Sequence, residues 1–565
     1  MTRAARAGAL VLTVAAIAAV AVSVAGQPAA QYDLLIRHAR VLDGTGNPWF
    51  PADVAVSNGR IAAVGSLDDA RAARTIDASG LYLSPGFIDI HSHADDGARA
   101  EGGLRDDSPD RRAAPNLVSQ GITTVVVNQD GRSPWPIATQ RARLASGQIG
   151  VNALLLVGHG TIRRMAMGAD NEKRPATASE IGRMRELLRQ GLAEGAVGLS
   201  AGLEYEPGRW STTSELVELA KELPPVDGIY ISHERSEGSD PLWYVPSQDG
   251  PGPPTLLDAV RETIAIGEQA GARVVASHLK AKGAHYWGSS AAAVGLLQRA
   301  RDRGVDVWAD QYPYPTSGTD GSTVLIPAWA TSAPGGGDRA AVLKRLLGDP
   351  PTEQQIRGDI AHEISRRGGA EQILVFDYSD TSLYGKPLAD IARTWQMDPV
   401  DAAIRIQMDG LPDRRGGARM RGFSMDESDM ELIAQQPWVA TSTDGGIALP
   451  EDGPTTHARF YGSFTRKIRH YALERRAISL EHAVRAATSL PARIMRLTDR
   501  GLIRPGMAAD LVLFDLNTIR DTATFFEPHQ HSEGVPYVFV NGVAAVDDGR
   551  RTGALAGQVL TAATR

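Results

Sequence analysis

The sequence predicts an α/β protein: a (β/α)8, TIM-like barrel with a flanking β-sandwich-like domain built from both chain ends, and an insertion between strands seven and eight. Three observations support this fold. Apolar, β-branched runs alternate with helical stretches through the middle of the chain, which is typical of parallel βα units. We count eight such runs, the number that closes a barrel. Short alternating runs separated by Gly and Asn stand at both chain ends.

The composition is that of a soluble, globular protein. The chain has 565 residues, of which 42% are hydrophobic and 22% charged, and its formal net charge is -7. A chain of this length is too long to fold around one small hydrophobic core. The mildly negative charge gives no reason to expect nucleic acid as a partner. The sequence contains no cysteine, which excludes disulfides, a lipidated cysteine and any thiolate metal ligand.

The amino terminus predicts export. Arg3 and Arg6 precede an apolar segment, 7–25, which small residues follow. This pattern predicts a secretory signal peptide over residues 1–30, cleaved within 26–30, and a periplasmic or secreted protein. The alternative is an uncleaved membrane anchor, since an apolar segment of this length can just span a bilayer.

Both chain ends are predicted to contribute strands to one small β-domain, which covers residues 31–84 and 495–565. Its strands are marked by apolar or alternating runs bounded by Gly and Asn turns. The expected strands are 32–37, 40–42, 53–56 and 60–64 at the amino-terminal end, and 510–515, 537–542 and 543–546 at the carboxyl-terminal end.

Residues 85–494 are predicted to form the barrel. The first six gaps between expected strand ends are 31 to 44 residues long, but the last is 132 residues. The excess places an insertion at about 325–435, and long insertions in such folds are usually lids or specificity elements. Residues 240–256, with aromatics amid Pro and Gly, form a second insertion. The expected strand ends are His91, Asn128, His159, Gly202, Glu234, His278, Tyr312 and Asp444.

Several of these strand ends carry groups that bind metal. His91 and His93 are two residues apart on one strand and therefore face the same side, and Asp89 is placed to orient a neighbour. His233 and His278 follow strands five and six, and Asp444 follows strand eight. In a parallel barrel these ends meet. Four imidazoles and a carboxylate suit Zn²⁺ and leave room for water.

The chain resembles the amidohydrolase superfamily and, more narrowly, the N-acyl-D-amino-acid deacylases (D-aminoacylases), from about residue 32 to the carboxyl terminus. This resemblance implies the barrel with its β-domain, one or two zinc ions and hydrolysis of an amide. It implies that His233 and His278 bind the tightly held zinc, that His91 and His93 bind at a second, weaker position, and that Asp444 is a metal-site residue and the catalytic base. The resemblance is carried by PGFIDIHSH (85–93), QGITTVVV (120–127), VGHGTIR (157–163), GAVGLSAGLEYEPG (195–208), YISHERSEG (230–238), SHLKAKG (277–283), DQYPY (310–314), STDG (442–445), YGSFTR (461–466) and RGLIRPGMAADLVLFD (500–515).

One departure from the family pattern concerns the second strand. In the deacylases it typically ends in a Gly-Asn-Cys-Gly-like segment whose cysteine binds zinc, whereas residues 128–131 read Asn-Gln-Asp-Gly here. Asp130 therefore occupies the cysteine position and is a candidate zinc ligand. Alternatively it caps the following turn, as Asp before Gly often does. Strand four does not end in lysine, which disfavours a carbamylated-lysine bridge.

Candidate substrate-binding residues stand near the same strand ends. Tyr205 matches a family tyrosine that contacts substrate, with loop packing as the alternative. Arg235, Lys280 and Lys282 are cations that can bind a free carboxylate. Arg235 has an alternative role, pairing with a nearby glutamate, either Glu234 or Glu237.

Further polar and aromatic residues stand near the same strand ends. Glu204 and Glu206, which flank Tyr205, are expected to face solvent. The alternative is that they face the pocket, where they would repel an acidic acyl group or side chain and favour a neutral or cationic one. His159 is expected to be structural or to orient substrate, and the tyrosines of 310–314 to line the pocket floor.

The sequence therefore predicts an exported, zinc-dependent amidohydrolase that cleaves N-acyl-D-amino acids or related amides by a metal-activated water, with Asp444 as general base. The alternatives are a cyclic-amide or dipeptide hydrolase on the same barrel, or an inactive metal- or ligand-binding relative. The expected partner is a small N-acyl amino acid or amide. A membrane is expected as a partner only if the amino-terminal segment stays uncleaved.

Overall fold

The computed structural model describes residues 31–95, 102–169, 172–318, 323–332 and 338–561. The predicted signal peptide, residues 1–30, lies outside the described residues. Within the described part, no helix combines the length and the apolar character needed to cross a membrane.

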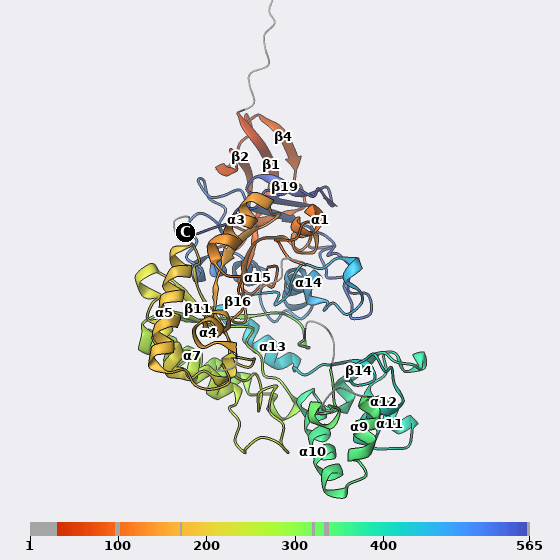
Figure 1. Cartoon of the computed structure of the whole chain (residues 1–565). Coiled ribbons are helices and arrows are strands. Elements are labelled where there is room, and N and C mark those ends of the chain that lie inside the picture. The colour runs from red at the N-terminus through yellow and green to blue at the C-terminus, as the bar shows by residue number, and fades with distance from the viewer. Residues whose placement is uncertain (1–30, 96–101, 170–171, 319–322, 333–337, 562–565) are drawn as a thin grey trace, which may run out of the picture.

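Within the described residues, the two chain ends build one nine-stranded sheet, seen at the top of Figure 1. Strand β5 joins the two halves, because it pairs in parallel with β1 and antiparallel with β17. The predicted β-sandwich-like domain is therefore a single sheet in its hydrogen bonding. The strands are β1 (Tyr32–Val41), β2 (Phe50–Ser57), β3 (Arg60–Gly65), β4 (Ala72–Asp77), β5 (Tyr82–Pro85), β17 (Leu511–Phe514), β18 (Tyr537–Val540), β19 (Val543–Asp547) and β20 (Arg550–Arg551).

The middle of the chain contains strands that pair only in parallel among the described residues, in the orders β6-β7-β8 and β9-β10-β11-β12-β13-β16. Leu156 alone separates β8 from β9, so these two count as one strand position. The strands are β6 (Phe87–Asp89), β7 (Ile122–Val127), β8 (Asn152–Leu155), β9 (Val157–Gly158), β10 (Gly198–Gly202), β11 (Ile229–His233), β12 (Arg273–Ala276), β13 (Val307–Gln311) and β16 (Val439–Thr441).

The first and last of these strand positions meet at their carboxyl ends. Ser92 forms a parallel bridge with Gly445, and the Asp444 amide donates to the His91 carbonyl at 3.0 Å. The eight observed ends lie within three residues of the predicted ones. Most of these strand residues are buried, as expected for parallel strands covered on both faces. This connectivity brings the metal-binding candidates of distant segments to one edge.

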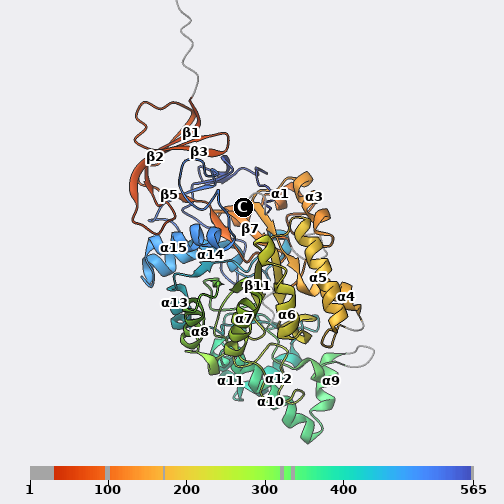
Figure 2. The same ribbon diagram turned by 90° about the vertical axis from the view of Figure 1, so that its left-hand side faces the viewer.

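Helices cover the outside of the parallel strands, and α5, α6, α7 and α8 pack successively against one another (Figure 2). Helices α5 and α7 begin with capping boxes, Thr177 with Glu180 and Thr255 with Asp258. The helices are α1 (Pro109–Arg112), α2 (Pro115–Val118), α3 (Ile137–Gly147), α4 (His159–Met167), α5 (Ala178–Ala193), α6 (Thr213–Ala220), α7 (Leu256–Ala270), α8 (Ser290–Asp302), α13 (Glu427–Ala434), α14 (Arg459–Arg466), the π-helical segment Lys467–Glu474, α15 (Leu480–Ala487) and α16 (Ser489–Ile494).

The predicted insertion forms a lobe at the lower right of Figure 1, with its own hydrophobic cluster between Leu325 and Met420. Its predicted end near 435 is too late, because α13 packs on α8 beside the parallel strands. The lobe touches the 240–256 loop through an ion pair of 2.9 Å between Arg366 and Asp240. Its elements are α9 (Arg339–Leu346), α10 (Pro350–Arg366), β14 (Ile373–Asp377), α11 (Leu388–Thr394), α12 (Pro399–Asp409) and β15 (Arg419–Gly422).

Candidate metal centre

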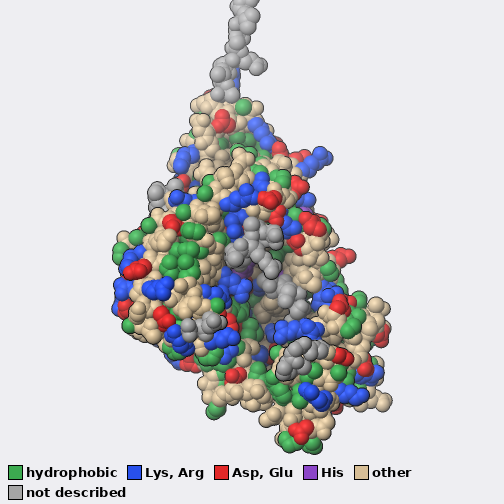
Figure 3. Space-filling view, in the orientation of Figure 1, with side chains coloured by type: hydrophobic (Ala, Val, Ile, Leu, Met, Phe, Trp, Pro, Cys, Tyr) green, Lys and Arg blue, Asp and Glu red, His purple; other side chains and the backbone are tan. Residues whose placement is uncertain are grey.

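A cavity of about 490 Å³ lies at the carboxyl ends of the parallel strands. Figure 3 shows Lys and Arg side chains gathered around a hollow on this side of the molecule. The cavity joins residues from the strand ends, from the 240–256 loop and from the insertion lobe. Its charged lining consists of His93, Asp130, Arg132, His233, Glu237, Lys280, Lys282, Arg367, Asp444 and Arg459.

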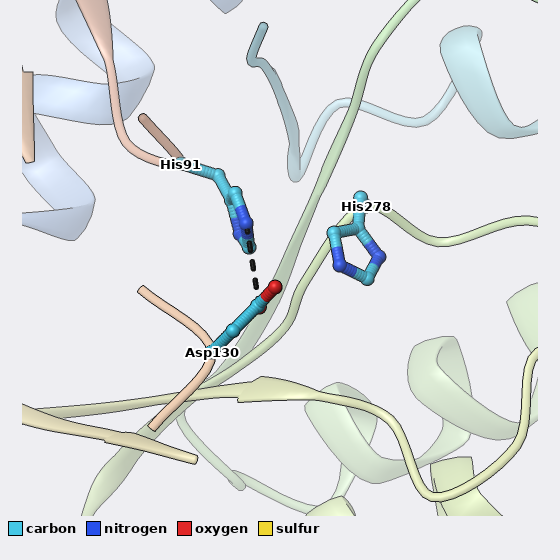
Figure 4. A group of neighbouring side chains, drawn as sticks. All are labelled: His91, Asp130 and His278. Carbon is cyan, nitrogen blue, oxygen red and sulfur yellow. Dashed lines mark ion pairs between the residues drawn. The ribbon is translucent and has the colours of Figure 1, made fainter. Parts of the chain in front are cut away.

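All the predicted metal-binding side chains converge at this place. Three overlapping groups have ligand atoms within 4.8 Å of one another. In Figure 4 the side chains of one group, His91, Asp130 and His278, come together from three different segments. The remaining two groups are His91, His93 and Asp444 on one side, and His233, Glu237 and His278 on the other. Asp130 therefore lies between two sets of ligands, an arrangement with donors enough for one or two cations.

Three atoms in this cluster show that it suits a cation. His91 Nε2, His233 Nδ1 and Asp130 Oδ1 are buried and have no hydrogen-bond partner among the described residues. Asp130 Oδ1 is 3.6 Å from His91 Nε2 and 3.7 Å from His233 Nδ1. Each buried polar atom without a partner costs roughly 1–3 kcal/mol. A metal ion bound by such an atom removes its cost, and imidazole with carboxylate is a donor set that suits zinc.

The alternative role of Asp130 as a turn cap is not what the structure contains. The Asp130 carboxylate points to the imidazoles, with Oδ2 3.6 Å from His93 Nε2. The amide of the next residue, Gly131, donates instead to Ser200 Oγ at 3.2 Å.

The histidines are held in place by buried side chains behind them. His91 Nδ1 lies 2.5 Å from Ser277 Oγ, which donates to Asp310 at 2.6 Å. Asp310 also accepts from the His278 amide at 3.0 Å. Asp89 accepts from the His91 amide at 3.2 Å, and burial raises the pKa of Asp89 to about 7. The Ser277 contact orients the His91 ring, as is usual around metal sites, and the two amide bonds hold the backbone at His91 and His278.

The protonation of the histidines is set by burial and by the carboxylates around them. Burial lowers the pKa of His91 and of His278, which favours the neutral imidazole that binds metal. Burial also acts to lower the pKa of His233, but Glu237, Asp130 and Glu204 outweigh it, and its pKa is raised. A proton therefore competes with a metal ion for His233 more strongly than for the other two.

Asp444 is an ionised carboxylate at the edge of the cluster. Its Oδ1 is 3.2 Å from His93 Nε2, and its Oδ2 is 2.9 Å from Arg459 Nη1. Burial acts to raise the pKa of Asp444, but Arg459, His278 and the hydrogen bond with His93 hold it well below its usual range. The carboxylate is therefore ionised at neutral pH.

The candidate substrate-binding residues divide into two groups. Tyr205 and Lys280 line the cavity. The Tyr205 ring lies 4.4 Å from the His233 ring, centroid to centroid, and burial raises the pKa of its hydroxyl well above the usual value. Lys280 Nζ lies 2.8 Å from His278 Nδ1 and also pairs with Glu237. Both are therefore placed to donate hydrogen bonds into the cavity.

Arg235 belongs to the second group, because its partners hold it outside the cavity lining. Its Nε is 2.8 Å from Glu262, and the guanidinium also donates to the carbonyls of Arg209 and Ser211 at 3.1 Å. The expectation that Arg235 binds a substrate carboxylate is therefore wrong for this arrangement. The expected alternative named a different glutamate, since the partner is Glu262.

The other expectations near the site had mixed outcomes. Glu206 is exposed and accepts from Trp210 Nε1 at 2.7 Å, as expected, but Glu204 is buried, contrary to expectation. His159 is fully buried and lies 2.9 Å from Glu215, which supports its structural role. Tyr312 is buried beneath His278, with ring centroids 6.5 Å apart.

Sequence reasoning missed Glu237 and Arg459 as parts of the site. Glu237 follows His233 by four residues, and its Oε1 lies 3.2 Å from His278 Nδ1. This four-residue spacing, in the loop after strand five, was the one sequence feature that could have indicated Glu237 as part of the site. Arg459 begins α14 beyond the strand-eight loop, and its contact with Asp444 depends on the fold of that loop.

Known proteins resemble this chain over most of its length. A family profile described as the amidohydrolase family matches residues 74–221 and 378–546. The N-acyl-D-glutamate deacylase of Alcaligenes xylosoxydans xylosoxydans is 34% identical over 91% of this chain and 93% of its own length. A D-aminoacylase structure, from work on its binuclear metal centre, has a TM-score of 0.70 at 30% identity, covering 94% of this chain and all of that one.

A second solved structure is similar to the same extent. The N-acyl-D-glutamate deacylase of Bordetella bronchiseptica was determined with zinc and a phosphonate inhibitor that mimics the tetrahedral intermediate. It has a TM-score of 0.70 at 32% identity, and the match covers 94% of this chain and 99% of that one.

Proposed function

Because the chain belongs to the amidohydrolase family, among the N-acyl-D-amino-acid deacylases, we propose that it is a zinc-dependent enzyme that hydrolyses the amide bond of an N-acyl-D-amino acid. The observation that carries this proposal is that His91 Nε2, Asp130 Oδ1 and His233 Nδ1 are buried without a hydrogen-bond partner in the described part of the chain, and that Asp130 and His233 line the cavity. The parallel strands and their helices fit a (β/α)8 barrel with the reaction centre at the strand ends.

The residues that would hold zinc are His91, His93, Asp130, His233 and His278, with Glu237 and Asp444 at the edges of the same cluster. A zinc ion supplies Lewis-acid activation of water and of the amide carbonyl when it is bound.

Asp444 is placed to move the proton in this reaction. It is ionised, so it can accept a proton from the attacking water and then deliver it to the leaving amine. Arg459 forms an ion pair with Oδ2, while Oδ1 lies toward the imidazoles of His91 and His93. The Tyr205 hydroxyl, which keeps its proton, is placed to donate to the carbonyl oxygen as negative charge develops.

The cations of the lining fit a substrate with a free carboxylate. Lys280, Lys282 and Arg459 line the cavity beside the metal-binding cluster. Arg459 also lies over the Tyr312 ring, with 4.6 Å between its guanidinium carbon and the ring centroid, which limits its motion. A carboxylate bound by these groups would place the adjacent amide near Asp444. From Arg3, Arg6 and the apolar segment after them, export with cleavage of residues 1–30 is part of the same proposal.

The test combines metal analysis with a substrate screen. Protein purified without chelator is assayed for zinc, and then for release of free amino acid from N-acetyl-D- and N-acetyl-L-amino acids. The proposal predicts bound zinc and release from D-substrates. If no amino acid is released from any of these amides, the deacylase assignment is refuted. If the protein then binds zinc and hydrolyses other amides, it is a metal-dependent hydrolase of a different substrate.

A further inference from the structure

Glu204 is a buried carboxylate in the turn that follows β10. It is 2% exposed, although the neighbouring Glu206 in the same turn is exposed. Burying a carboxylate is costly unless it is paired and hydrogen-bonded. Its partners therefore indicate what it does.

The first partner of Glu204 is a metal-binding candidate. Glu204 Oε2 lies 3.1 Å from His233 Nε2, while the other ring nitrogen, Nδ1, faces Asp130 Oδ1 at 3.7 Å and is buried without a hydrogen-bond partner in the described residues. A neutral imidazole carries one proton. When that proton is on Nε2 and is donated to Glu204, the lone pair on Nδ1 faces the cluster.

The second contact of Glu204 ties a cavity wall to the same carboxylate. Oε1 accepts from the amide of Leu242 at 2.7 Å, and Leu242 lines the cavity from the 240–256 loop. Lys282 Nζ, which pairs with Glu237 at 2.7 Å, lies 3.9 Å from Glu204 Oε2 and adds positive charge beside it. With both oxygens engaged, the carboxylate is fixed, and it in turn fixes the plane of the His233 ring.

We propose that Glu204 is a positioning residue of the metal centre: it orients His233 through Nε2 so that Nδ1 is presented to a zinc ion shared with Asp130. Glu204 touches neither the cation nor the substrate in this arrangement. The inference rests on the proposed zinc site but not on the identity of the amide that is hydrolysed. It deepens the proposed function by naming a residue that sets metal affinity.

The test is the zinc affinity of metal-free Glu204→Gln, measured without substrate by competition with a chromophoric chelator. Loss of such a carboxylate behind a ligating histidine typically weakens metal binding by about 10- to 100-fold. We expect about 10-fold for Glu204→Gln, which keeps the shape of the side chain, and up to about 100-fold for Glu204→Ala. The zinc concentration for half-maximal activity should rise by the same factor, with KM within about twofold.

Glu206→Gln is the matched control, because it removes the same charge two residues away in the same turn and should bind zinc like the wild type. Equal zinc affinity in Glu204→Gln and Glu206→Gln would overturn the proposal. Failure of metal-free Glu204→Gln to fold would also overturn the proposal, because the carboxylate would then be needed for folding rather than for metal binding. The two proposals can fail separately. If the wild type binds zinc tightly but cleaves no N-acyl amino acid, the proposed function is refuted, and the role of Glu204 in zinc binding is not affected.

Discussion

The substitution Asp130→Asn tests whether zinc binds at the three buried atoms that have no hydrogen-bond partner in the described residues. Asp130 Oδ1 is one of those atoms, and leaving such an atom buried without a partner costs roughly 1–3 kcal/mol. An ion recovers that cost in the wild type. The neutral Asn oxygen binds a cation more weakly than a carboxylate oxygen does. The free energy of zinc binding should therefore weaken by roughly 1–3 kcal/mol, or about 5- to 150-fold in affinity at ~1.4 kcal/mol per factor of ten.

The assay is a titration of the metal-free protein with zinc in competition with a chelator, together with the thermal unfolding of each form. Asp227→Asn is a suitable control, because Asp227 has φ 57° and Asp130 has φ 55°, so the same exchange is made in the same left-handed backbone conformation. The control should leave zinc affinity unchanged. Zinc affinity within twofold of wild type in Asp130→Asn would refute the reasoning and exclude Asp130 as a zinc ligand. Asp130→Cys should tighten zinc if the position is a ligand.

Three further predictions follow from the site and the core. Asp444→Asn should lower kcat by about 10²- to 10⁴-fold while zinc content stays near wild type, and unchanged kcat would contradict its role as base. Tyr205→Phe should lower kcat by about 10²-fold in a steady-state assay, and wild-type kcat would leave Tyr205 only a packing role. Burial lowers the pKa of Lys467 to about 7, so the unfolded chain binds more protons between pH 7 and 10.5 and stability should rise with pH there. Lys467→Met should abolish that rise in denaturant unfolding and stabilise the protein below pH 7, and a persisting slope would place the titration elsewhere.

The fold could be predicted from the sequence where burial on both faces makes strands read as apolar runs. Strand ends such as Gly202 and His233 were placed within a residue because these runs stop where the chain turns to solvent. The histidines were found because they sit at those ends. The hydrogen bonding of the β-domain was harder to predict, because the pairing of β5 with β17 joins residues more than 400 positions apart.

The parts of the site that sequence reasoning missed depend on contacts between different strand ends and loops. Glu204 meets His233 from 29 residues away, so the sequence alone could not distinguish it from the exposed Glu206. Arg235 looked available until the fold placed Glu262 beside it. In both cases the charged residue type was visible, but its partner was set by the packing of neighbouring strand ends.

The most direct test of the account is the effect of zinc on the hydrolysis of N-acetyl-D-amino acids. The protein is stripped with a chelator, assayed for release of free amino acid, and assayed again after zinc is restored. The account predicts that release stops on stripping and returns with zinc, in wild type and not in Asp444→Asn. Release that persists at full rate in protein shown to be free of metal would contradict it.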